Sequence, residues 1–176
     1  AHANSICPVP GGDYLISFRQ NHLIARIDRE TKKFSWEMCD WKLGHQHDVQ
    51  MLENGNILVY ANGAHGPYHG PNEGSRIFEI DPSTNETVWE YVGSPAHTFD
   101  SPFISGCQPM PNGNVLICEG RSGRLFEVTR DGETVWNFNS PIVADHAPYT
   151  PGRSIFRSYR YTAESPEIAG RLGDPS

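Results

Sequence analysis

The sequence repeats one short pattern three times, and no other feature constrains its fold as strongly. Residues 8–16, 51–59 and 109–117 each hold a glycine turn followed by an apolar run. The copies start 43 residues (8 to 51) and then 58 residues (51 to 109) apart. A repeat at this spacing indicates that each unit is one structural module that packs against the next.

Each unit holds about four short strands, because an apolar strand, a polar turn and a tryptophan-bearing strand follow every glycine turn. These three segments lie at 23–28, 30–33 and 34–37, then at 77–81, 83–86 and 87–90, and finally at 125–129, 130–133 and 134–137. Asn-Gly and Asp-Gly pairs favour tight hairpins, since asparagine and glycine adopt positive φ at little cost. Four strands per unit and a period in the forties are typical of a β-propeller blade.

We therefore predict an all-β fold with three four-stranded propeller blades. The blades are expected at residues 1–44, 45–102 and 103–138, and residues 139–176 are expected to form a final strand and a C-terminal tail. One tryptophan per unit is expected to pack between neighbouring blades. A closed propeller has four to eight blades. The missing part of the ring is expected to come from the same polypeptide, a separate partner chain or a second copy.

Charge and composition narrow the function. The net charge of −7 argues against a nucleic-acid surface, which needs clustered lysine and arginine. No apolar run approaches the 18 residues of a membrane span. Four cysteines show no CxxC or CxxH spacing, so a structural zinc site is not expected. Either free buried thiols or one disulfide would fit them.

The second unit is longer because of an insertion at residues 62–74. Its four glycines and two prolines exclude a strand. An insertion on one face of a repeat array often marks the binding face. His65 and His69 lie in this insertion and are candidate site residues.

Polar residues recur at equivalent positions of the units. Alignment on the glycine turns pairs His2 with His45 and Asn4 with His47, and Ser105 takes the second place in the third unit. In a propeller the first strand of each blade lines the central channel. Residues two apart on a strand point to the same side. We therefore expect these side chains to face one shared axis.

Loops after the second strand of each unit are expected beside this axis, and they add three arginines, Arg19, Arg121 and Arg124. A histidine-rich axis fits acid–base or nucleophilic chemistry, a transition-metal site, or the polar lining of a wet channel. We expect no metal, since few carboxylates lie nearby. Asp48 should point to the opposite face of its strand and hydrogen-bond the backbone of the neighbouring blade.

Four segments in order resemble the arylsulfotransferase family. They are the H-x-N-S run at 2–5, the Q-H-D run at 46–48 with the Asn-Gly pairs at 54–55 and 62–63, the run at 100–105, which is similar to the family's aromatic-x-S-P segment, and the F-R-x-Y-R-Y run at 156–161. The resemblance implies a six-bladed propeller with its active site on the axis. It also implies transfer of a sulfuryl group between phenolic compounds through a sulfohistidine, with no nucleotide donor or other cofactor. A small aromatic substrate and a periplasmic or extracellular location follow from it.

The resemblance assigns roles to the candidate residues. Catalytic roles are expected for His2, His47, His65 and Arg124, and substrate binding for Asn4, His45, His69, Arg19, Arg121 and Ser105. The third-blade loop at 121–124 contains no histidine. Two other functions therefore stay open: a hydrolase or lyase on the same scaffold without a covalent histidine, and a non-catalytic binding or assembly module.

Overall fold

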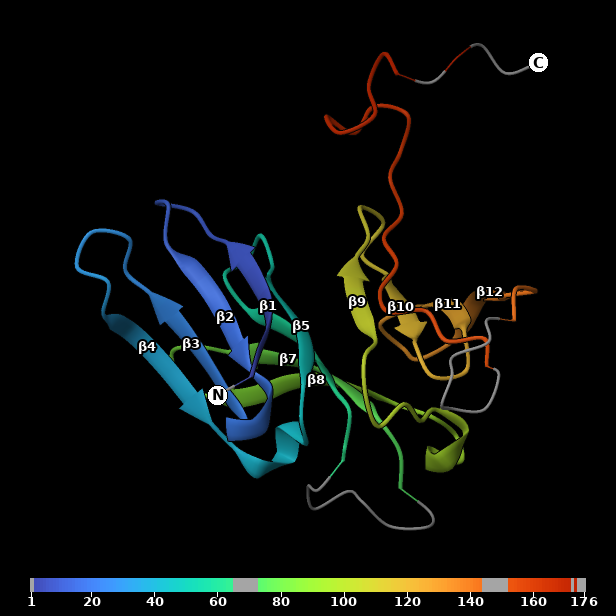
Figure 1. The fold of residues 1–176 in the computed structure, drawn as a ribbon, viewed down its shortest axis with the longest axis horizontal. Coiled ribbons are helices and arrows are strands. Elements are labelled where there is room, and N and C mark those ends of the chain that lie inside the picture. Colours follow the sequence, from blue (N-terminus) through green and yellow to red (C-terminus); the bar gives the residue numbers. More distant parts are fainter. Residues whose placement is uncertain (1, 65–72, 144–151, 172, 174–176) are drawn as a thin grey trace.

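The chain folds into three consecutive four-stranded antiparallel sheets, which confirms the predicted sheet pattern (Figure 1). The computed structural model describes residues 2–64, 73–143, 152–171 and 173, and all structural statements concern these residues. Within each sheet, strands that are adjacent in the sequence are also paired in space. Each sheet is therefore a simple meander with short connections.

The strands have the following bounds. The first sheet contains β1 (Ala3–Pro8), β2 (Tyr14–Phe18), β3 (Leu23–Ile27) and β4 (Phe34–Cys39). The second contains β5 (His47–Met51), β6 (Ile57–Ala61), β7 (Arg76–Asp81) and β8 (Glu86–Val92). The third contains β9 (Gly106–Pro109), β10 (Val115–Glu119), β11 (Arg124–Val128) and β12 (Thr134–Asn139). Three 3₁₀ helices lie in the connections, η1 (Arg19–Asn21), η2 (Trp41–Leu43) and η3 (Ala96–Thr98).

Glycine turns set the strand register, as the sequence predicts. In the β5–β6 hairpin Gly55 has a φ of 88°, a conformation that side chains with a Cβ rarely adopt. The turn places Met51 opposite Ile57 in the pair of strands. The register is irregular between His47 and Gln50, at the end of the hairpin away from the turn.

Apolar side chains fill the two spaces between neighbouring sheets. One cluster joins the first and second sheets, and a second cluster joins the second and third sheets. Trp36 packs against the first cluster and Trp89 against the second. Each indole also donates to the next sheet, Trp36 to Asn85 Oδ1 at 3.1 Å and Trp89 to the Arg130 carbonyl at 2.7 Å. The predicted inter-sheet position is confirmed for these two tryptophans.

The C-terminal segment differs from the prediction. No strand is assigned among the described residues beyond β12, so the expected final strand is not formed there. Residues 155–161 instead run beside the third sheet (Figure 1). Ile155 N donates to the Gly120 carbonyl at 2.8 Å, and Ser105 N donates to the Phe156 carbonyl at 3.0 Å. These two isolated bonds do not make a ladder, because the segment has no paired strand.

Two arginines bind equivalent places on the second and third sheets. Arg130 pairs with Glu79 and lies 4.1 Å above the Trp89 ring, while Arg160 pairs with Glu127 and lies 4.6 Å above the Trp136 ring. Replacing either arginine with alanine is expected to lower the free energy of unfolding by about 1–2 kcal/mol. Urea denaturation measures both losses. An Arg160→Ala variant as stable as the parent would contradict the equivalence.

The four cysteines are free thiols, so the alternative of a disulfide does not hold. Burial raises the pKa of the Cys118 thiol to about 12, which keeps it protonated. No cluster of three potential metal-ligating side chains occurs in the described part of the chain. Among the same residues, no helix has the length and apolar character needed to cross a bilayer.

Candidate functional site

His47 opens strand β5 and is nearly enclosed, with 4% of its surface exposed. Its Nδ1 lies 2.7 Å from Asn62 Oδ1. The amide nitrogen of Asn62 donates to the carbonyls of Ser101 and Ile104 at 2.7 and 2.9 Å. Because both amide protons are committed, Asn62 can only accept from the ring, so Nδ1 carries the proton. The neutral imidazole therefore holds its lone pair on Nε2.

The surroundings of His47 keep its ring uncharged. Burial lowers its pKa from 6.5 to about 4, and the positive charges of Arg19 and Arg157 act in the same direction. Hydrogen bonding to Asn62 and to the His45 backbone raises the pKa but does not offset burial. Near neutral pH the ring is thus a nucleophile or proton acceptor and not a cation.

Arg19 provides a positive charge close to this ring. It begins η1, and its main-chain N–H donates to the His2 carbonyl at 2.8 Å. Within the described residues its guanidinium makes no hydrogen bond or ion pair. Partial burial lowers its pKa, although an arginine stays protonated. An unpaired, partly desolvated guanidinium beside a neutral imidazole favours binding of an oxyanion.

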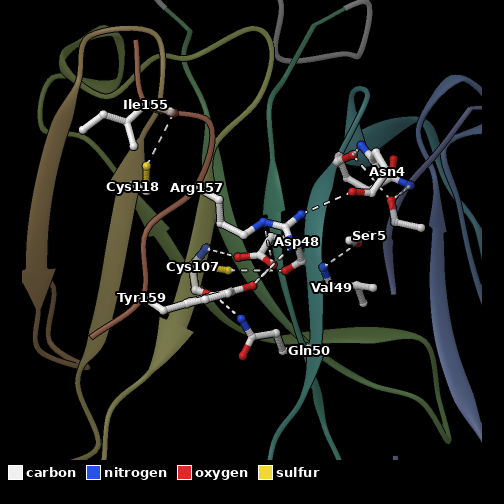
Figure 2. Close-up of polar contacts among 12 residues, drawn as sticks. Asn4, Ser5, Asp48, Val49, Gln50, Cys107, Cys118, Ile155, Arg157 and Tyr159 are labelled. Atoms are coloured by element: carbon white, nitrogen blue, oxygen red, sulfur yellow. Dashed lines mark hydrogen bonds and ion pairs between the residues drawn. The ribbon is translucent and has the colours of Figure 1, made fainter. Parts of the chain in front are cut away.

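Asp48 follows His47 in β5, and its carboxylate joins three parts of the chain (Figure 2). Its Oδ2 accepts from the Cys107 N–H at 3.0 Å, which matches the expected bond to a neighbouring sheet. Its Oδ1 accepts from the Tyr159 hydroxyl at 2.5 Å and lies 3.4 Å from Arg157 Nε. A Cβ on Gly106 would lie 2.3 Å from this carboxylate, so only glycine leaves room for it.

Arg157 extends this cluster to the first sheet. Its Nη2 donates to the Asn4 carbonyl at 3.2 Å, so one side chain of the C-terminal segment contacts β1 and Asp48 (Figure 2). Burial raises the pKa of Asp48, and the charge of Arg157 opposes that rise. The C-terminal segment is therefore part of the structure that holds β5 in place.

His45 lies outside strand β5 and has a φ of 65°. The alternation of a strand therefore does not relate it to His47, contrary to the expectation from spacing. Its ring stacks on His22 with 5.0 Å between centroids, and its N–H donates to His22 Nδ1 at 3.2 Å. His22 in turn stacks on Trp41 at 4.5 Å. These three rings form an aromatic stack at the junction of the first and second sheets.

The other candidate residues occupy separate places. Asn4 Nδ2 donates to the Gln46 carbonyl at 2.8 Å, while its buried Oδ1 has no partner in the described structure. Ser105 Oγ accepts from Gly120 N at 2.9 Å. His2 is exposed, and its carbonyl bonds Arg19. The inserted pair, His65 and His69, lies outside the described residues.

The arginines of the third-sheet loop contact their own sheet and the loop before it. Arg121 lies 3.8 Å from Asp100. Arg124 donates to Asn137 at 2.7 Å, lies 3.8 Å from Glu119 and packs 4.0 Å above the Phe126 ring. Of the predicted candidates, Arg19 is the one whose charge acts on His47, and Arg157 acts on the same ring.

A family model described as arylsulfotransferase (ASST) matches residues 1–141. This match covers 141 of the 176 residues, including all three sheets. The chain belongs to the arylsulfotransferase family. No curated protein matches the sequence.

Solved propellers share the fold of this arylsulfotransferase-family chain. The WD40 β-propeller domain of Doa1 matches with a TM-score of 0.58 and 14% identity, over 80% of this chain and 42% of that one. Virginiamycin B lyase from Staphylococcus aureus matches with a TM-score of 0.55 and 18% identity, over 80% of this chain and 42% of the lyase. A Bacteroides caccae protein of unknown function matches with a TM-score of 0.56 and 17% identity, over 78% of this chain and 46% of that protein. The chain spans less than half of each, and such low identities show the fold alone.

Two residues of the site, Asn62 and Arg157, were not among the sequence-predicted candidates. Asn62 is part of an Asn-Gly pair shared with the arylsulfotransferases, and it follows a fully buried strand. A polar residue directly after such a strand could have indicated a buried hydrogen bond. Arg157 lies in the F-R-x-Y-R-Y run, whose family resemblance was the only signal.

The lowered pKa of His47 predicts a pH dependence of stability. Between pH 4 and 6.5 the unfolded chain binds a proton that the folded ring does not. The free energy of unfolding should therefore rise with pH across this range, by up to about 3 kcal/mol from this group. Urea denaturation of the parent and of His47→Gln at several pH values isolates the contribution. A difference between the two proteins that stays constant from pH 4 to 7 would contradict it.

Proposed function

We propose that this arylsulfotransferase-family protein transfers a sulfuryl group between phenolic compounds, with His47 at the reacting centre. The observation that carries the proposal is a neutral imidazole, fixed by Asn62 with its lone pair on Nε2, beside the guanidinium of Arg19, which has no partner among the described residues. An aryl sulfate carries one negative charge on its sulfate oxygens. Arg19 is a suitable partner for those oxygens, and Arg157 adds positive charge nearby.

The proposed reaction has two steps. Nε2 of His47 attacks the sulfur, the bond between sulfur and the phenolic oxygen breaks, and the released phenolate takes a proton from solvent. The oxygen of a second phenol then attacks the same sulfur, the N–S bond breaks, and the phenolic proton passes to solvent. Charge builds up on the sulfuryl oxygens in both steps, where Arg19 can stabilise it.

Hydrolysis is the second candidate function. The third-sheet loop at 121–124 lacks a histidine, and the pKa of about 4 also suits His47 as a proton acceptor. Binding of an anion beside the ring would raise that pKa and make proton transfer easier. In this case water, activated by His47, takes the place of the second phenol.

One assay separates the two functions. The protein is incubated with 4-nitrophenyl sulfate, with and without phenol, and release of 4-nitrophenol is measured. Release that depends on phenol, together with formation of phenyl sulfate, supports transfer. Release without phenol supports hydrolysis, and no release under either condition overturns both. The periplasmic or extracellular location proposed from the family is tested separately by cell fractionation.

A further inference from the structure

Each of the first two sheets of this propeller, hereafter blades, holds the next blade through the same residue position. Ser5 in the first blade accepts from the Val49 N–H at 3.1 Å, and Asp48 in the second accepts from the Cys107 N–H at 3.0 Å. Gln50 donates to the Cys107 carbonyl at 2.7 Å. These contacts join the innermost strands β1, β5 and β9, which run side by side in one direction (Figure 1).

The third blade uses one of these positions, that of Gln50, to hold the C-terminal segment 155–161; the position of Ser5 and Asp48 is Gly106 there. Gln108, which corresponds to Gln50, donates to the Arg160 carbonyl at 2.9 Å and accepts from Arg160 N at 2.7 Å. Ser105 contacts Phe156, and further along the chain Gln108 contacts Arg160. Because residue numbers increase in the same direction on both sides, the segment runs parallel to β9. It therefore lies where the innermost strand of a fourth blade would lie.

A second set of contacts links the segment to the place of a following blade, although Arg130 lies in the turn between β11 and β12 and not on an innermost strand. Arg130 of the third blade lies between Glu79 and Trp89 of the second blade. Arg160 lies in the same way between Glu127 and Trp136 of the third blade. Asparagine pairs hold the two carboxylates identically, Asn54 and Asn56 on Glu79, and Asn112 and Asn114 on Glu127. The contacts of the third blade with the segment therefore match the contacts of the second blade with the third.

The face of the third blade that a fourth blade would cover is exposed at β12. Phe138 is 42% exposed, whereas the corresponding Tyr91 of the second blade is 9% exposed. Trp136 is 41% exposed despite its contact with Arg160. The main-chain groups of Arg157, Ser158 and Tyr159 make no hydrogen bonds within the described structure. Exposed aromatic side chains thus lie beside an extended segment whose main-chain groups at 157–159 have no hydrogen-bond partner among the described residues.

We propose that residues 155–161 are the innermost strand of a fourth blade, whose three outer strands come from a further propeller segment that lacks its own innermost strand. The chain spans less than half of each propeller that it resembles, so further blades are needed to close a comparable ring. A complete four-stranded blade does not fit, because its first strand would need the place that 155–161 occupy. Such completion of a sheet through a free strand edge is an established mode of recognition.

The test uses a partner of the required form made from this sequence. Residues 13–151 lack β1 and the C-terminal segment, so their first blade has three strands and an open edge. Mixed with the full chain, this partner should form a one-to-one complex by light scattering. Exchange of the Ser158 and Tyr159 amides should slow by about tenfold or more. The matched control, residues 1–151, retains β1 and should form no complex.

Two results would overturn the proposal. One is equal binding of residues 1–151 and 13–151, which would mean that whole blades dock on this face. The other is no binding by 13–151 while its second and third blades stay protected from exchange.

If 13–151 does not fold, a second experiment uses a fusion in which residues 13–39 are joined by a flexible linker after residue 161 of the chain. Unchanged exchange of Ser158 and Tyr159 in that fusion also overturns it, and Ser158→Pro should abolish any slowing.

Discussion

Replacing His47 with alanine is expected to lower the rate of 4-nitrophenyl sulfate turnover by about 100-fold or more. The variant loses the Nε2 lone pair, which is the proposed attacking group of the site. It also leaves Asn62 Oδ1 without its partner, since the amide nitrogen of Asn62 is committed to two carbonyls. The cost in stability is expected to be about 1–3 kcal/mol, so the fold should persist.

Two controls make this result specific to the site. His97→Ala removes an exposed histidine of η3 and should leave turnover unchanged. Asn62→Ala keeps the His47 ring but removes the acceptor that holds the proton on Nδ1, so the proton can occupy either ring nitrogen. This variant should therefore reduce turnover less than His47→Ala does. Amide exchange of β5–β8 confirms that each variant is folded. Full turnover by a folded His47→Ala variant would remove this residue from the reaction.

The strands could be predicted because their signals are local. Each Asn-Gly or Asp-Gly turn fixes a hairpin within a few residues, and the alternation of apolar residues then sets the buried face. The repeat reinforces these signals, since three copies give the same reading. The inter-sheet positions of Trp36 and Trp89 follow from the repeat in the same way.

The site could be predicted only in part, because its contacts join distant segments. Spacing pairs His45 with His47, but the positive φ of His45 and of Asp48 breaks the alternation on which that pairing rests. Tyr159 bonds Asp48 across 111 residues, and no local pattern indicates such a contact. The sequence predicts a final strand and a tail at residues 139–176, but no strand is assigned among the described residues beyond β12. The position of residues 155–161 depends on the third blade, where Gln108 and Glu127 bind Arg160.

Asp48→Ala is expected to cause the largest loss of stability, about 3–5 kcal/mol in the free energy of unfolding. The Asp48 side chain is 2% exposed and is the acceptor for the Cys107 N–H and the Tyr159 hydroxyl. Its removal leaves both donors unsatisfied and the Arg157 charge without its carboxylate. Ser5→Ala is the matched control, because Ser5 makes a single equivalent bond to the Val49 N–H and should cost only about 1 kcal/mol.

Asp48→Ala changes two things at once: it removes the contacts of the carboxylate, and it places alanine at a positive φ. Two further variants separate these effects. Asp48 has a φ of 52°, which asparagine tolerates nearly as well as aspartate does and alanine does not. Asp48→Asn should therefore retain the backbone conformation and still lose the ion pair with Arg157. Adding Arg157→Met to Asp48→Ala removes the unpaired buried charge, so the double variant should regain part of the lost stability. If urea denaturation shows Asp48→Ala to be no worse than Ser5→Ala, the contacts between Asp48, Cys107 and the C-terminal segment do not hold the sheets together.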